Sequence, residues 1–213
     1  MGAYAPRLLR PAPATSLVLD VLSQAGAAPH SSSIDHATKV LADVSQKPVS
    51  ATGVGSLPGG ARSWSVDDID ALADRYAQAA PRDDRAAVHL LFLRGSYEGD
   101  SSVLGVAVRG DVAAVFSDQV ASADTPVISE GAIEDAVTIH ELGHLLGLVD
   151  LVLSTGRGDP DHPGHSRNRG SVMYWAVESD LVTQVLGGGP PRDFDSQDRA
   201  DLAAIRSGQG GPG

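Results

Sequence analysis

Short apolar runs and segments with helical periodicity alternate along most of this chain. The strongest apolar run spans residues 85–94, and the run at residues 17–22 shows little alternation, so both are typical of buried strands. Three shorter runs, at residues 48–54, 104–108 and 112–116, predict further strands. Together with the helical segments described next, these runs predict an α/β domain.

Helical periodicity is clearest at residues 33–44, where apolar side chains recur on one face of the expected helix. These side chains are Ile34, Ala37, Val40, Leu41 and Val44. A second helix is expected to begin after Ser65 and to continue to Ala79. Asp67 and Asp68 would lie in its first turn, where the helix dipole favours acidic groups.

A third helix is expected to be capped by Ser129 and to end at Gly147, because glycine adopts the left-handed conformation after a helix without penalty. A loop-rich remainder follows it. Residues 1–16 contain three prolines and predict a flexible arm, disordered or extended, and residues 207–213 predict a flexible tail. One domain is therefore expected over residues 17–206.

Glycine-containing segments separate the predicted strands and helices. Residues 55–60 and residues 95–102 are expected to be loops. The tripeptide Arg109-Gly110-Asp111 lies between two strand runs, so we interpret it as a turn and not as an adhesion motif.

Composition narrows the function classes. The 213 residues carry a net charge of −11, and nothing in them would neutralise a phosphate backbone, which argues against nucleic-acid binding. The 42% hydrophobic and 20% charged residues are typical of a soluble globular protein, and we expect a monomer. The charge also fits simple solubility, although acidic residues in glycine-containing loops leave calcium as a second cofactor to consider.

Two absences limit the chemistry further. The chain has no cysteine, so a thiolate zinc site and a cysteine nucleophile are excluded, and any metal must be held by histidine and carboxylate. No apolar run approaches the roughly 20 residues of a transmembrane helix, and residues 1–16 lack the apolar core of a signal peptide.

The segment His140-Glu141-Leu142-Gly143-His144 carries the clearest chemical signal. Residues four apart on a helix lie on the same face, so both imidazoles can reach one metal ion. Glu141 would leave the helix at another angle and face a metal-bound water. This arrangement predicts a zinc-dependent hydrolase in which Glu141 is the general base and later the acid.

The third metal ligand has more than one candidate. Gly147 turns the chain, and Asp150, three residues further on, would lie beneath the metal. A loop downstream offers two imidazoles, His162 and His165. We favour His165 because imidazole is the commoner zinc ligand in such sites, and Asp150 remains the alternative, either as a ligand or as a residue that orients one.

The segment from His140 to Asp150 resembles the signature of metzincin metallopeptidases, His-Glu-x-x-His-x-x-Gly-x-x-His/Asp. Met173-Tyr174 resembles the Met-turn, which forms a hydrophobic floor beneath the zinc in that clan. His165-Ser166 stands eight residues before Met173-Tyr174, as in the matrixin branch, whereas Asp150 follows Gly147 as in the snapalysin branch.

The resemblance implies a metzincin-like catalytic domain with a twisted, mostly parallel sheet, an antiparallel edge strand and an irregular C-terminal subdomain. Leu104, Gly105 and Val106 would belong to the edge strand that binds substrate backbone, and Trp175 would help to wall the specificity pocket. A C-terminal helix is expected from about Asp193 to Ile205. The resemblance also favours a secreted or cell-envelope location and a protein or peptide substrate.

Three alternatives to a metzincin endopeptidase stay open at this stage, and one of them is hydrolysis of an amide or ester bond in a non-peptide substrate. Glu178 could be a zinc ligand on a later helix, as in gluzincin hydrolases, although that interpretation explains neither Gly147 nor Met173. The chain could also be an inactive zinc-binding interaction module, but such a module has no use for a base at Glu141.

Overall fold

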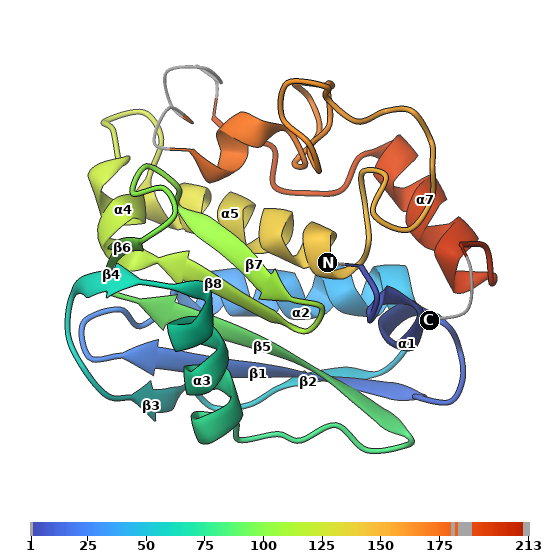
Figure 1. The fold of residues 1–213 in the computed structure, drawn as a ribbon, viewed down its shortest axis with the longest axis horizontal. Helices are drawn as coiled ribbons and strands as arrows, with labels where there is room; N and C mark the ends of the chain where they lie inside the picture. Colours follow the sequence, from blue (N-terminus) through green and yellow to red (C-terminus); the bar gives the residue numbers. More distant parts are fainter. Residues whose placement is uncertain (1, 180–181, 183–188, 211–213) are drawn as a thin grey trace.

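A computed structural model describes residues 2–179, 182 and 189–210. Within these residues, six strands form a mixed sheet in the order β2-β1-β5-β8-β7, and β3 also pairs with β1 (Figure 1). The strands of this sheet are β1 (Ser16–Gln24), β2 (Val49–Ala51), β3 (Gly55–Leu57), β5 (Arg85–Leu93), β7 (Gly105–Arg109) and β8 (Val112–Phe116). A separate pair is formed by β4 (Arg62–Trp64) and β6 (Gly95–Tyr97).

Strand directions match the sheet expected from the sequence. β1 runs parallel to β5, from the pair Ser16–Arg85 to the pair Ser23–Phe92, and β5 runs parallel to β8. Among the described strands of this sheet, only β7 is antiparallel to its neighbour, and it lies at the edge of the sheet. The prediction of a mostly parallel sheet with an antiparallel edge strand is confirmed.

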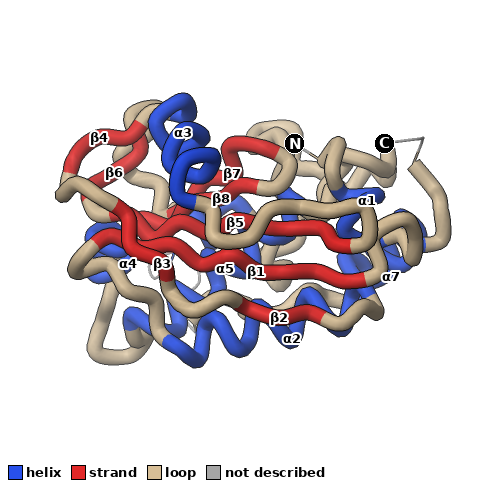
Figure 2. The backbone as a smooth tube through the Cα atoms, turned by 90° about the horizontal axis from the view of Figure 1, so that it is seen from below, coloured by secondary structure: helices blue, strands red, loops and turns tan. Residues whose placement is uncertain are grey.

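Helices cover both faces of this sheet (Figure 2). Helices α2 (Ser31–Ser45) and α5 (Glu130–Leu145) lie side by side on one face, whereas α3 (Val66–Tyr76) packs on the other. The remaining helices are α1 (Ala5–Leu9), α4 (Ser117–Ser122), the 3-10 helix η1 (Trp175–Glu178) and α7 (Ser196–Arg206). The loop-rich segment after α5 crosses over this helix on the side away from the sheet (Figure 1).

Helix α5 lies in the interior of the molecule, since every residue from Ile133 to Leu145 is buried. The larger apolar core joins α2 and α5 to the sheet, and a smaller core packs Ile69 and Ala73 of α3 against Leu91 and Phe116. A polar side chain on α5 is therefore shielded from solvent. The buried polar groups at the C-terminal end of α5 are therefore candidates for a functional site.

The N-terminal segment differs from the extended arm predicted by its prolines. Residues 5–9 form helix α1, in which Leu8 and Leu9 are fully buried and contribute to the larger core. Pro6 does not prevent this helix because it lies in the first turn, where the backbone N–H has no helical partner. The burial of two leucines outweighed a composition typical of disorder.

Smaller differences concern short elements. β3 and β6 lie within segments expected to be loops, because the edge of β1 and the strand β4 offer backbone partners that a local pattern does not reveal. α3 has the expected Ser65 cap, with a capping box to Asp68, but ends at Tyr76. In the described part of the chain, no helix is long and apolar enough to cross a membrane. The predicted C-terminal tail is described only as far as residue 210.

Candidate metal centre

Helix α5 brings His140, Glu141 and His144 into the interior of the molecule. The imidazoles lie one turn apart, and their Nε2 atoms approach to 3.1 Å. His140 and Glu141 are fully buried, and His144 is nearly so. Nitrogen atoms this close share either a proton or a common ligand, so the pair already defines one point in space.

The tautomer of His140 is set by its second nitrogen. Nδ1 lies 2.7 Å from the carbonyl oxygen of Val172, which can only accept a hydrogen bond, so Nδ1 carries the proton. Nε2 of His140 is then left with a lone pair that points toward His144. A backbone carbonyl in this position is the usual way to orient a metal-bound histidine.

His165 completes a triangle of imidazoles from the loop beyond α5. Its ring centroid lies 5.2 Å from that of His140 and 5.1 Å from that of His144, and those two are 4.8 Å apart. The backbone places this ring, since the next residue, Ser166, donates a hydrogen bond to the carbonyl of Met173 at 2.8 Å. Nδ1 of His165 has no hydrogen-bond partner within the described residues.

Met173 lies against the metal-binding end of α5. A Cβ atom on Gly143 would collide with the Met173 sulfur, so glycine at this position allows the contact. The backbone N–H of Met173 donates to Ser171 Oγ at 3.0 Å, and that hydroxyl donates to Asp198 of α7 at 2.9 Å. The segment that carries Met173 is thus fixed between two helices.

Two carboxylates face this group of imidazoles. Glu178, at the end of η1, places Oε1 2.8 Å from Nε2 of His165 and Oε2 3.5 Å from Nε2 of His140. Burial raises the pKa of Glu141 well above its usual value, and the nearby Glu178 carboxylate raises it further. For Glu178, burial also acts to raise the pKa, but the His140 and His165 rings outweigh it and bring it well below the usual value.

Burial lowers the pKa of His144 well below its usual value, and His140 and His165 lower it further. A neutral imidazole is the form that binds metal. The ligand atoms of His140, His144, His165 and Glu178 all lie within 4.8 Å of one another.

A zinc ion fits this group of residues. Nitrogen ligands at about 2.05 Å in tetrahedral geometry are roughly 3.3 Å apart, close to the separation seen between His140 and His144. Both oxygens of Glu141 are buried without a hydrogen-bond partner among the described residues. Burying polar atoms without hydrogen-bond partners costs free energy. A bound metal ion and the further ligands that it carries would provide the missing partners.

Asp150 and His162 lie outside this group. The Asp150 carboxylate organises its own loop, accepting hydrogen bonds from the backbone N–H groups of Thr155 at 2.6 Å, Gly156 at 3.1 Å and Gly158 at 3.1 Å. His162 stacks on Trp175, with ring centroids 4.4 Å apart. Of the candidates for the third ligand, the structure brings only His165 to the two helix histidines.

Two cavities adjoin the imidazoles. One of about 440 Å³ is lined by His162, His165, Trp175 and Glu178, among others, and one of about 180 Å³ is lined by Val106, Glu141, His144 and Glu178, among others. Gly105 of β7 crosses closely over α5, because a Cβ atom there would lie 2.8 Å from Glu141 Oε1. The edge strand therefore passes beside the expected base.

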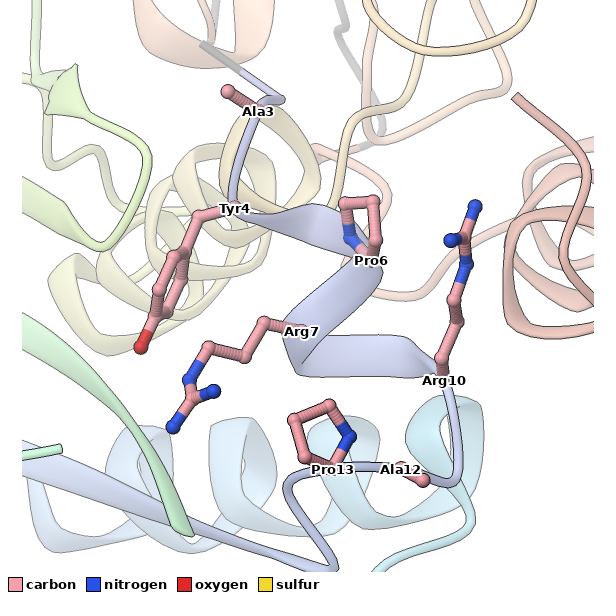
Figure 3. A pocket seen from close by; sticks show the side chains of 7 residues that line it. All are labelled: Ala3, Tyr4, Pro6, Arg7, Arg10, Ala12 and Pro13. Atoms are coloured by element: carbon pink, nitrogen blue, oxygen red, sulfur yellow. The ribbon is translucent and has the colours of Figure 1, made fainter. Parts of the chain in front are cut away.

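A third cavity, of about 350 Å³, lies at the N-terminus and has no residue in common with the imidazole group (Figure 3). Its basic side chains, Arg7 and Arg10, point away from each other in Figure 3. Each hydrogen-bonds backbone carbonyls, Arg7 that of Arg82 and Arg10 those of Gly208 and Gln209. These contacts tie the N-terminal segment to the rest of the chain, so we assign no ligand to this cavity.

Sequence reasoning placed Glu178 only in an alternative site without His165. The structure brings both residues to the same point, and no spacing rule connects a histidine in a loop to a glutamate 13 residues later. The separation in sequence between Glu178 and His144, the second helix histidine, is longer still. Only the folded path of the segment from 165 to 178 reveals the contact.

Comparisons with known proteins concern the fold. No protein-family model matches the sequence, and no curated protein sequence matches it. Among solved structures, archaemetzincin from Methanopyrus kandleri is similar with a TM-score of 0.58 and 20% identity, over 90% of this chain and 96% of that one. At this level of identity, the likeness shows a shared fold.

Two further structures give the same result. Archaemetzincin from Archaeoglobus fulgidus, crystallised with malonate, has a TM-score of 0.51 and 15% identity over 88% of this chain and 99% of its own. A zinc-dependent peptidase from Methanocorpusculum labreanum has a TM-score of 0.52 and 16% identity over 86% of this chain and 99% of its own. The mixed α/β fold described above is the fold of these proteins.

Proposed function

We propose that this chain is a zinc-dependent peptidase of the metzincin type that cleaves internal peptide bonds. In this proposal His140, His144 and His165 hold one zinc ion, and Glu141 is the general base and acid. One observation carries the proposal: two buried imidazoles and one partly buried imidazole converge beside a buried glutamate whose oxygens have no hydrogen-bond partner in the described residues. The similar solved structures support it, because their descriptions name archaemetzincins and a zinc-dependent peptidase.

Bound zinc would act as a Lewis acid toward the scissile carbonyl and would lower the pKa of a water molecule. The work of Glu141 is proton transfer. Its carboxylate would accept a proton from the attacking water at one oxygen and would return a proton to the nitrogen of the leaving amine. The same carboxylate serves both steps and holds the proton between them.

We place the substrate beside β7. In the described part of the sheet, β7 pairs only with β8, so its outer edge can add an extended peptide. Leu104 contributes less than its neighbours, because its N–H already donates to Glu178 at 2.6 Å and its carbonyl accepts from Phe116 at 2.8 Å. Gly105 and Val106 therefore carry the expected backbone contacts, and Trp175 walls the larger cavity.

Replacing Glu141 with glutamine tests the proposal. The purified wild-type protein should contain one zinc per chain and cleave casein, and chelation should stop cleavage. Glu141→Gln should keep the zinc and lose about 10²- to 10⁴-fold in turnover, the usual contribution of a general base. The matched control is Glu134→Gln, a buried glutamate on the same helix that accepts a hydrogen bond from the His30 backbone; it should keep both zinc and turnover.

Several outcomes would contradict the proposal. Cleavage that continues after complete removal of metal would rule out zinc-dependent catalysis. A wild-type protein that binds zinc but cleaves no protein or peptide substrate would favour an inactive binding module instead. Unchanged turnover in Glu141→Gln would remove the assigned base.

A further inference from the structure

We propose that Glu178 is a fourth protein ligand of the same metal ion, and that its carboxylate must move aside before a substrate can reach the metal. This inference rests on the zinc site of the proposed function and adds a resident ligand to it. It assigns to Glu178 both a share in metal affinity and control over access.

Position is the first argument. The Glu178 oxygens lie 2.8 Å from Nε2 of His165 and 3.5 Å from Nε2 of His140, at the point where the three imidazoles converge. One carboxylate therefore contacts two of the expected ligands at once. The side chain is 19% exposed, so it faces the imidazoles and not the solvent.

Charge is the second argument. Glu141 and Glu178 place two carboxylates next to each other in a buried site. Among the described residues, neither has a lysine or arginine partner in an ion pair. A buried negative charge is tolerated when it is paired or coordinates a metal. A divalent cation between the imidazoles is the group that would compensate both carboxylates.

The backbone around Glu178 is fixed from two sides. Its carbonyl accepts a hydrogen bond from Leu104 beside the edge strand at 2.6 Å, and the next residue, Ser179, forms a β-bridge with Val103. On the other side, η1 follows directly on Met173 and Tyr174. Only the Glu178 side chain is therefore free to change position while its Cα stays in place.

The cavities indicate what such a movement would do. Glu178 lines both the 440 Å³ cavity beside Trp175 and the 180 Å³ cavity beside Val106 and Glu141. A carboxylate bound to the metal stands between these two spaces. Displacing it would join them into one cleft that passes the metal, with Glu141 on one side.

The expected consequence is a closed site that opens by ligand exchange. Four protein ligands are typical of structural zinc, whereas catalytic zinc keeps one position for water or substrate. An incoming oxygen ligand would have to replace the Glu178 carboxylate. Zinc affinity and the affinity for small zinc-binding ligands should then respond to Glu178 in opposite directions.

The test measures both affinities in the wild type, Glu178→Ala and Glu178→Gln. Zinc affinity is determined by competition with a chromophoric chelator. Acetohydroxamate affinity is determined on the cobalt-substituted proteins by visible absorption. Asp161→Asn is the matched control, because Asp161 is an acidic residue that lines the same cavity but does not belong to the group of possible metal ligands.

Glu178→Ala should lose at least about tenfold in zinc affinity, which is the scale for residues that support a metal site. It should bind acetohydroxamate about tenfold more tightly if the open arrangement is about a tenth populated in the wild type. Glu178→Gln keeps the side-chain volume and should change in the same directions, which guards against a folding defect in the alanine variant. Asp161→Asn should change neither affinity by more than about twofold.

Unchanged zinc affinity in both Glu178 variants would overturn the inference. A loss of zinc affinity without tighter acetohydroxamate binding would also overturn it, because Glu178 would then only support the histidines. These results leave the proposed function intact as long as the wild-type protein binds zinc and cleaves substrate. A wild-type protein without zinc would instead defeat the proposed function itself.

Discussion

Two buried clusters of histidine and carboxylate differ in how completely their polar atoms are paired. In the sheet, Asp20 of β1 lies 2.9 Å from Nδ1 of His89 on the neighbouring β5, and both residues are buried. The backbone N–H of Gln78 donates to the same carboxylate at 2.9 Å, and the hydroxyl of Thr52 donates at 3.2 Å. This cluster joins β1 to two loops, and both oxygens of the Asp20 carboxylate accept hydrogen bonds.

In the cluster at the end of α5, by contrast, several polar atoms have no hydrogen-bond partner among the described residues. Both oxygens of Glu141 and Nδ1 of His165 have no hydrogen-bond partner among the described residues. An unpaired buried polar group costs about 1–3 kcal/mol, so a fold retains several of them together only where something else binds. The comparison separates a cluster that stabilises the fold from one that is arranged to bind a metal. Mutations in the two clusters should therefore change different properties.

The largest expected effect is that of His140→Ala on the metal centre. Removing one of three imidazoles should abolish stoichiometric zinc binding and reduce proteolysis to background, because the remaining ligands no longer enclose the ion. Elemental analysis and a casein assay on the same sample measure both. His162→Ala is the matched control, since its ring stacks on Trp175 outside the group, and it should retain one zinc. Full zinc occupancy in His140→Ala would remove the distinction between the clusters.

The next effect concerns stability alone. Asp20→Ala should lower the free energy of unfolding by about 3 kcal/mol, because it leaves His89 and two backbone N–H groups buried without their partner. Urea unfolding monitored by circular dichroism measures the loss, and zinc content measured below the transition should be unchanged. Loss of zinc from Asp20→Ala while the protein is still fully folded would show that the two clusters are coupled.

The smallest effect is a dependence on pH. Burial acts to raise the pKa of Asp20, but hydrogen bonds from His89 and Gln78 outweigh it, and the pKa lies below its usual value. The stabilisation by this carboxylate is therefore present above about pH 4, the value of an unfolded aspartate, and is lost as pH falls through the lower folded value.

Urea unfolding of the wild type and Asp20→Asn at pH 7 and pH 3, both with chelator so that metal loss does not contribute, measures this dependence. The difference in free energy of unfolding between the two proteins should be smaller at pH 3. A difference that stays constant would show that the Asp20 charge is not what stabilises the sheet.

Much of the fold could be predicted because its signals are local. The apolar run at residues 85–94 became β5, the helical pattern at 33–44 became α2, and Gly147, with a φ of 83°, takes the expected left-handed conformation just after α5. What failed depended on partners distant in the sequence. Helix α1 forms because Leu8 and Leu9 have a core to enter, and β3 forms because β1 has a free edge.

The same distinction between local signals and contacts distant in the sequence applies to the metal centre. The relation between His140 and His144 follows from the period of one helix, and the sequence alone could predict it. The contact of His165 depends on a loop that returns to Met173, and Glu178 depends on the path that follows. Neither contact follows from the period of a helix or strand, so the sequence alone could not eliminate Asp150 as a candidate.

The identity of the third zinc ligand can be tested by the zinc content of wild type, His165→Ala and Asp150→Ala, measured by elemental analysis of proteins purified in parallel. We expect one zinc per chain in the wild type and in Asp150→Ala, whose carboxylate only organises its own loop. We expect a loss of zinc in His165→Ala, which removes one side of the imidazole triangle. Retention of zinc in His165→Ala together with its loss in Asp150→Ala would show that Asp150, and not His165, is the third ligand.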